Sequence, residues 1–151
     1  MAIRLVMIDD EKDLLFINTE LFHMLGYVVH SFYCPQQGLT WMLENIDAFD
    51  VVLTDQSMPG LSGNELIQRV WVERQVPALL ISGYSSNTYL NNAEDPMLLT
   101  VEKPISVRRL DELIRSSWPS LESEASPHAQ GGDVELKRVG LVTAKAEKSN
   151  I

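Results

Sequence analysis

The sequence predicts an α/β fold: a doubly wound, five-stranded parallel sheet with helices on both faces. Short apolar runs rich in Val, Ile and Leu, which are typical of buried parallel strands, alternate along the chain with segments whose apolar residues recur at helical spacing. Polar residues follow four of these runs at the point where each run ends. Open α/β sheets bind ligands outside the carboxyl ends of their strands, so we expect a functional site at this edge.

The first half of the chain alternates three strands with two helices. We expect strands at residues 3–8, 27–33 and 51–54, and helices at residues 12–25 and 35–45. Gly26 stands where a C-cap glycine ends the first helix, because glycine adopts the left-handed conformation of that position without strain. Pro35 opens the second helix, since proline is tolerated in the first helical turn.

The second half continues the alternation. Helices are expected at residues 64–73, 85–93 and 107–118, and strands at residues 78–81 and 98–101. The helical pattern is weakest at 85–93, which is rich in asparagine, an indifferent helix former. The last helix has one apolar face, as expected of a helix packed on a sheet. That face consists of Leu110, Leu113, Ile114 and Trp118.

Five successive β-α units restrict how the strands can be ordered. Crossover connections between parallel strands are almost always right-handed, which leaves few topologies. We expect the flavodoxin-like strand order 2-1-3-4-5, which is common for this number of units and makes the first and third strands neighbours at the switch point. The ends of the strands at 3–8 and 51–54 should therefore lie side by side.

The domain is expected to end near residue 118. Pro119 stops the last helix, and residues 120–133, with their Ser, Glu, Pro and Gly, are typical of a linker. Residues 134–143 alternate enough to form an added strand, but a flexible or non-native tail is the favoured interpretation. Residues 1–118 are thus assigned to one domain, and residues 119–151 to a linker and tail to which we assign no function.

The composition excludes several classes of function. With 151 residues and 45% hydrophobic content, the chain supports one domain of ordinary size. Its net charge of -9 disfavours direct binding to nucleic acid, which depends on Lys and Arg. The single cysteine, Cys34, excludes an intrachain disulfide, and no apolar run is long enough for a membrane span or a signal peptide. We expect a cytoplasmic protein with no nucleic-acid or membrane partner.

Three acids converge at the expected switch point. Asp9 and Asp10 follow the first strand and Asp55 follows the third, and neighbouring strands lie about 4.8 Å apart. Carboxylates brought together in this way repel one another unless they are protonated or bind a cation. Mg²⁺ is the expected ion, because it accepts one or two carboxylates and leaves positions for water and phosphate oxygens.

A hydroxyl and an amine flank these acids. Ser82 ends the fourth strand and Lys103 follows the fifth, so both are expected at the same edge of the sheet. Phosphoryl transfer depends mainly on positioning and charge neutralisation, and a carboxylate is an established covalent acceptor. Asp55, the central acid, is therefore the expected nucleophile. Asp10 alone would be explained equally well as a helix cap, but capping does not explain a hydroxyl and a lysine at the same edge.

Four motifs together resemble the receiver domain of response regulators in two-component signalling, over residues 3–118. They are the acid pair in IDDEKD, the loop DQSMPGLSGNEL that begins at Asp55, the hydroxyl in ISGYS and the Lys-Pro pair in VEKPI. Each motif alone is weak, but the four in this order and spacing are specific. The resemblance implies a CheY-like, phosphoryl-accepting switch that is not a turnover enzyme and catalyses only its own phosphorylation and dephosphorylation.

The resemblance also implies roles for individual residues. Asp55 would accept a phosphoryl group from the phosphohistidine of a sensor histidine kinase or a phosphotransfer protein. Mg²⁺ would be held directly by Asp10, by the Asp55 carboxylate and by the backbone carbonyl of Ser57. Asp9 would act on the ion mainly through water.

The switch is where the chain departs from the family pattern. The resemblance implies that Lys103 pairs with the phosphate beside a cis Lys103–Pro104 bond, and that Ser82 hydrogen-bonds the phosphate and draws its loop inward. The family usually places an aromatic residue three positions before the lysine, and here that residue is Thr100. We hypothesise that Tyr84 serves the switch instead or screens the acyl phosphate from water.

Phosphorylation would then change a protein-binding surface formed by residues 85–93, 98–101 and 107–118. This surface would contact a downstream protein target or, in a homodimer, a second copy of the chain. The chain is interpreted as a single-domain regulator or as the receiver of a hybrid sensor kinase. The residues after 118 are too few, and too mixed in charge, for a DNA-binding module.

Three other functional classes are disfavoured by the sequence. A phosphorylation-independent binding module is disfavoured by the intact Asp55 and Lys103. An aspartyl-phosphate hydrolase is disfavoured because Ser57 stands where such enzymes need a second catalytic Asp. Flavin binding is disfavoured because a phosphate-binding loop would need Gly, Ser and Thr donors where this chain has acids.

Overall fold

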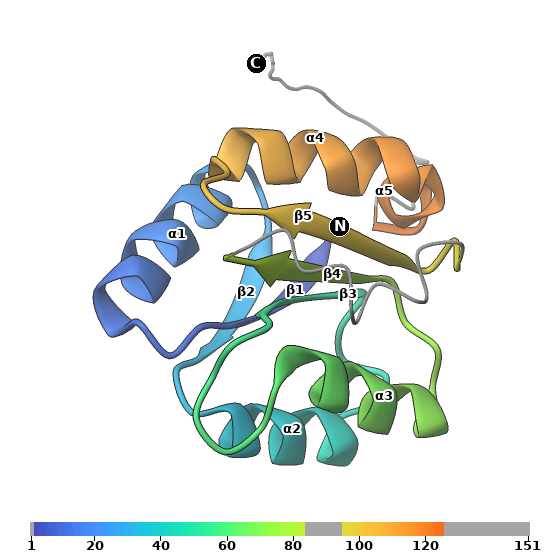
Figure 1. The fold of residues 1–151 in the computed structure, drawn as a ribbon. Helices are drawn as coiled ribbons and strands as arrows, with labels where there is room; N and C mark the ends of the chain where they lie inside the picture. The colour runs from blue at the N-terminus through green and yellow to red at the C-terminus, as the bar shows by residue number, and fades with distance from the viewer. Residues whose placement is uncertain (1, 84–94, 126–151) are drawn as a thin grey trace. The chain divides into compact units, whose positions relative to one another are not determined.

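The computed structural model describes residues 2–83 and 95–125, with side chains to residue 122 (Figure 1). Ile3–Trp118 forms one compact unit, and the residues outside this range group separately from it. Of the elements in the described residues, the compact unit contains all five strands and four helices. Among the described residues, no helix is both long and apolar enough to span a membrane.

Five parallel strands form one sheet in the order β2-β1-β3-β4-β5, which confirms the predicted fold class and strand order. The strands are β1 (Arg4–Ile8), β2 (Val28–Phe32), β3 (Val51–Asp55), β4 (Ala78–Ser82) and β5 (Leu98–Glu102). In the pairing of β1 with β3, Leu5 lies opposite Val51 and Ile8 lies opposite Thr54. The two strands therefore end at the same edge of the sheet.

Within residues 2–83 and 95–118, four helices cover the two faces of the sheet. They are α1 (Lys12–Met24), α2 (Pro35–Glu44), α3 (Gly63–Glu73) and α4 (Val107–Ser117). α1 and α4 lie over one face, and α2 and α3 lie over the other (Figure 1). Local signals fix the helix ends: Gly26 has a φ of +96° just after α1, and Ser62 opens α3 with a capping box that includes Glu65.

The face that carries α2 and α3 holds a continuous hydrophobic cluster. Alternate strand residues point into it, because successive side chains of a strand face opposite sides of the sheet. Full burial of each large aliphatic side chain stabilises the fold by about 1.5–3 kcal/mol. The buried members are Val6, Ile8, Leu39, Met42, Phe49, Val52, Leu61, Leu66, Ile67, Val70, Val76, Ala78, Leu80 and Leu98. Leu61 belongs to the loop between β3 and α3, so the core also anchors that loop.

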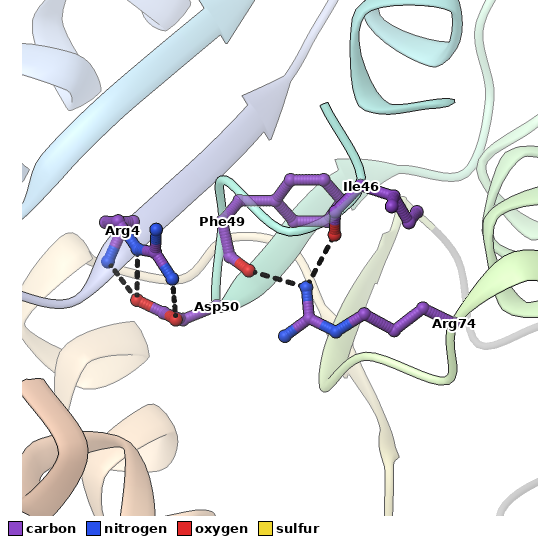
Figure 2. A network of polar contacts seen from close by, with 5 residues as sticks. All are labelled: Arg4, Ile46, Phe49, Asp50 and Arg74. Carbon is purple, nitrogen blue, oxygen red and sulfur yellow. Dashed lines mark hydrogen bonds and ion pairs between the residues drawn. The ribbon is translucent and has the colours of Figure 1, made fainter. Parts of the chain in front are cut away.

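Two arginines fix the amino-terminal edge of the sheet (Figure 2). The Arg4 side chain donates to both carboxylate oxygens of Asp50, at 2.9 and 3.1 Å, and the Arg4 backbone N–H donates to the same carboxylate. Burial of Asp50 raises its pKa, but the hydrogen bonds from Arg4 outweigh this effect and hold the pKa below its ordinary value. Arg74 donates to the carbonyl oxygens of Ile46 and Phe49, at 2.7 and 2.8 Å.

The start of the expected linker is helical, which corrects that part of the prediction. A short helix, α5 (Pro119–Ala125), occupies it. Pro119 ends α4 but also fits the first turn of a new helix, where its missing N–H has no cost, and the acidic Glu122 suits a first turn as well. The helix predicted at residues 85–93, the strand considered at residues 134–143 and the side chain of Tyr84 lie outside the described residues.

Candidate functional site

The carboxyl ends of four neighbouring strands bring together the polar residues that the sequence predicts for the site. These are Asp9 and Asp10 after β1, Asp55 at the end of β3, Ser82 at the end of β4, and Lys103 after β5. Asp55 lies opposite Ile81 in the pairing of β3 with β4, and Ser82 lies opposite Glu102 in the pairing of β4 with β5. The strand ends are thus level, and their side chains share one edge.

The three acids form a tight cluster. Carboxylate oxygens of Asp9, Asp10 and Asp55 lie within 4.8 Å of one another. Asp9 and Asp55 are buried, with 7% and 5% of their surface exposed. The backbone N–H of Glu11 donates to Asp9 Oδ1 at 2.9 Å, which holds this carboxylate in place. Oxygen donors of negative charge at this spacing fit a hard divalent cation such as Mg²⁺.

Lys103 supplies part of the positive charge that the cluster needs. Its Nζ lies 3.1 Å from Asp55 Oδ2. Burial of Asp55 raises its pKa and the negative charge of Asp9 raises it further, whereas Lys103 lowers it, and the resulting pKa is about 7. Burial lowers the pKa of Lys103, but the charge of Asp55 outweighs this and holds the pKa above its ordinary value. Lys103 is therefore protonated at neutral pH and does not by itself neutralise the acids.

Asp55 is consequently poised between two protonation states. A carboxyl group with a pKa of about 7 is half ionised at neutral pH. Only the ionised form is a nucleophile. A cation held between the acids would favour that form, because an opposite charge at short range lowers the pKa of a carboxyl group.

The loop that follows Asp55 is fastened at its base. The N–H of Gln56 donates to the carbonyl oxygen of Ile81 at 2.8 Å, and the N–H of Gly63 donates to the carbonyl oxygen of Gln56 at 3.0 Å. The side-chain Oε1 of Gln56 accepts a hydrogen bond from the N–H of Asn64 at 2.9 Å. A Cβ atom at position 63 would collide with the backbone carbonyl of Asp55, so only glycine lets the start of α3 approach this closely.

The remaining predicted residues lie at or near the same edge. Ser82 is buried, and its carbonyl oxygen accepts a hydrogen bond from the Lys103 N–H at 2.8 Å. The Lys103–Pro104 peptide bond is cis, the conformation that the resemblance implies. Ser57 is exposed in the loop two residues after Asp55.

Thr100 lies in β5 opposite Leu80 of β4. Its hydroxyl oxygen is buried and has no hydrogen-bond partner among the described residues. A small, partly buried polar side chain therefore occupies the strand position where receivers usually carry an aromatic ring. A readout based on rotation of an aromatic side chain at this position is not available to the chain.

The sequence alone does not identify Gln56 as a residue of the site. Its side chain reaches Asn64, eight residues further along the chain, and this separation matches no local capping pattern. The contact exists only because the loop folds back on itself. No sequence signal would have identified it without the path of the loop.

The sequence of the chain matches a known protein family. Residues 5–115 match the response regulator receiver domain family. The chain belongs to this family. Receiver domains are signalling switches rather than turnover enzymes, bind Mg²⁺ at an acidic pocket, and interact with histidine kinases or phosphotransfer proteins.

Curated relatives of this receiver are longer proteins. The two-component response regulator ARR12 of Arabidopsis thaliana is 27% identical over 117 residues, which cover 74% of this chain and 19% of that protein. The virulence sensor protein BvgS of Bordetella pertussis is 28% identical over 141 residues, which cover 85% of this chain and 11% of that protein. The chain thus spans about a fifth or less of the length of these relatives.

Solved receiver structures match this chain over nearly the whole of their own length. A CheY-like receiver domain from Methanospirillum hungatei has a TM-score of 0.70 and 26% identity, covering 82% of this chain and 99% of that one. The response regulator TrrA of Thermotoga maritima, solved in complex with Mg²⁺-BeF, has a TM-score of 0.66 and 20% identity, covering 76% and 98%. Because TrrA is only 20% identical to this chain, its likeness shows the fold alone.

Proposed function

We propose that Asp55 accepts a phosphoryl group from the phosphohistidine of a sensor histidine kinase or a phosphotransfer protein. The observation that carries this proposal is the burial of Asp55 between acids and a lysine at the carboxyl edge of the sheet. An ionised oxygen of Asp55 attacks the phosphorus, and the P–N bond to the donor histidine breaks. The electron pair of that bond returns to the imidazole, which takes up a proton.

Mg²⁺ is the proposed metal. Asp10, the Asp55 carboxylate and the backbone carbonyl of Ser57 would hold it directly, and Asp9 would act through water. The cluster of carboxylate oxygens within 4.8 Å supports this ligand set, and TrrA was solved with Mg²⁺-BeF. The ion supplies positive charge that keeps Asp55 ionised and neutralises the incoming phosphoryl oxygens.

Lys103 and Ser82 are the proposed partners of the phosphoryl group. Lys103 is protonated and already pairs with Asp55, so its Nζ can move from the free carboxylate to a phosphoryl oxygen. Ser82 ends the neighbouring strand and brings a hydroxyl to the same edge. A hydrogen bond from this hydroxyl to the phosphoryl group would draw the chain after β4 toward the site. With Thr100 in place of an aromatic residue, that movement is the proposed start of the switch.

The phosphodonor must reach the edge that carries Asp55. α1 begins two residues after Asp10 and exposes a set of large apolar side chains. We propose that the kinase or phosphotransfer protein docks along this helix, because the helix begins next to the site and exposes these apolar side chains. The members of the set are Leu14, Phe16, Ile17, Leu21 and Met24.

The output is proposed to be protein contact in the cytoplasm. The surface would include β5, α4 and residues 85–93, and it would bind a downstream target or a second copy of the chain. Because relatives such as ARR12 and BvgS extend well beyond the matched region, this receiver is either a stand-alone regulator or part of a larger sensor protein. The free thiol of Cys34 suits a reducing compartment.

Phosphorylation by acetyl phosphate with Mg²⁺, followed by intact mass, tests the proposal directly. We expect the wild-type chain to gain one phosphoryl group, and Asp55→Asn or removal of Mg²⁺ to abolish the gain. Asp50→Asn is the matched control, because Asp50 precedes the same strand at the opposite edge and should leave the gain intact. Absence of the gain in the wild type would instead favour a receiver that works by binding alone.

A further inference from the structure

We propose that Gln56 is a positioning residue for the metal site, an inference that rests on the proposed function. Gln56 lies between Asp55 and Ser57, the two neighbours in sequence proposed to hold Mg²⁺. It makes three hydrogen bonds: one from its N–H to Ile81, one to its carbonyl from Gly63, and one to its side chain from Asn64. These bonds tie the residue between two metal ligands to both β4 and the start of α3.

The side-chain bond has a different role from ordinary helix capping. The first N–H groups of a helix lack partners within the helix, and Ser62 already caps α3 by accepting from the Glu65 N–H at 3.1 Å. Gln56 satisfies another of these groups, the N–H of Asn64, from the strand side of the loop. It therefore connects the strand that carries Asp55 to α3 across the base of the loop.

The geometry at the base of the loop leaves little room for compensation. Gly63 packs against the backbone carbonyl of Asp55 so closely that a side chain is excluded. Without the bond between Gln56 and Asn64, the base of the loop would keep only the two backbone hydrogen bonds of Gln56. The carbonyl of Ser57, one residue further on, would then be held less firmly in register with the carboxylates of Asp10 and Asp55.

A Mg²⁺ titration of the full 151-residue chain, followed by NMR amide shifts, tests this inference. Gln56→Ala is expected to weaken Mg²⁺ affinity by about threefold to tenfold, the range that corresponds to losing one hydrogen bond coupled to binding. Gln56→Glu keeps an acceptor for Asn64 at a helix N-terminus that favours negative charge, so it should restore the affinity. Exchange of the Asn64 amide proton reports in each variant whether that bond is formed.

Ser62→Ala is the matched control. It removes a side-chain cap from the same helix, and it lies at the far end of the loop from the proposed metal ligands. We expect it to lower the melting temperature but to leave Mg²⁺ affinity unchanged. Equal weakening by Gln56→Ala and Ser62→Ala, or unchanged affinity in Gln56→Ala, would overturn the inference. Failure of the wild type to bind Mg²⁺ would overturn the proposed function itself, and this result is visible without any variant.

Discussion

Asp55 is a carboxyl group whose protonation is decided by its neighbours. Its burial and the charge of Asp9 act in one direction, and Lys103 acts in the other. We predict that Asp9→Asn lowers the pKa of Asp55 below about 7 in Mg²⁺-free buffer, because it removes a negative charge. Lys103→Met should shift the pKa in the opposite direction. The ¹³C shift of the Asp55 carboxyl carbon, followed as a function of pH, measures both effects.

The control for these titrations is Asp50→Asn. Asp50 is also partly buried, but it is bound by Arg4 at the amino-terminal edge of the sheet. Its replacement should leave the pKa of Asp55 where it is in the wild type. An Asp55 pKa that does not change in Asp9→Asn would show that Asp9 does not contribute to it and that burial, opposed by Lys103, sets it.

The charged residues of the site are predictable from the sequence, but the contacts that hold them are not. The proximity of Asp55 and Lys103 is predictable, because parallel strands in a known order end at one edge of the sheet. The role of Gln56 is not predictable, since its bond to Asn64 depends on how the intervening loop closes. Thr100 departs from the family pattern in the sequence itself, but only the structure shows that its hydroxyl is buried and has no hydrogen-bond partner in the described part of the chain.

At the scale of the elements, Arg74 joins the end of α3 to the turn before β3. Its guanidinium donates to two backbone carbonyls and lies 5.7 Å from the centre of the Phe49 ring. We predict that Arg74→Ala lowers the free energy of unfolding by about 1–3 kcal/mol, because it leaves both carbonyls without this partner. Urea denaturation measures the loss.

The exposed Arg69 of α3 provides the comparison for Arg74. Arg69→Ala removes the same charge from α3, the helix that Arg74 follows, and should change the free energy of unfolding by less than about 0.5 kcal/mol. Phosphorylation by acetyl phosphate should be unaffected in both variants, because both arginines lie away from the strand ends that carry the site. Equal losses in the two variants would mean that charge, rather than the two carbonyl bonds, accounts for the effect.

The strands and the four long helices were predictable because apolar periodicity and end signals agree. The expected strand at residues 51–54 corresponds to β3 (Val51–Asp55), and the expected helix at residues 64–73 corresponds to α3 (Gly63–Glu73). The exception is α5, because Pro119 predicts the end of one helix but not the start of another. Proline ends one helix and can begin the next, so the residue type alone does not distinguish a linker from a helix–helix junction.

At the scale of the whole compact unit, the two edges of the sheet differ in how their charges are compensated. At the amino-terminal edge, Arg4 binds Asp50 through both carboxylate oxygens. At the carboxyl edge, three acids lie within 4.8 Å of one another, and Lys103 forms an ion pair with Asp55. Clusters of like charge destabilise a folded protein, and they are typical of sites that bind a ligand or an ion. The ion pair that stabilises the fold and the acids of the proposed metal site therefore lie at opposite edges of one sheet.

The acid cluster makes the stability of the receiver depend on Mg²⁺ and on pH together. The pKa of Asp55 is raised, so without a cation this group contributes stability at low pH that is lost as the pH rises through about 7. Mg²⁺ binds the ionised form, so its stabilising effect should grow over the same range. At a free concentration of ten times Kd, we expect about 1.4 kcal/mol, or a rise in Tm of about 3–6 °C, at pH 8.

Thermal unfolding with and without Mg²⁺, at pH 5.5 and pH 8, measures this coupling. The rise in Tm should be larger at pH 8, and a chelator should reverse it. Asp55→Asn should show a small rise that is the same at both values of pH, because the titrating group is gone and one carboxylate ligand with it. A rise in the wild type that is equal at pH 5.5 and pH 8 would show that Mg²⁺ binds without Asp55, and the ligand set would then have to be sought among the other acids of the cluster.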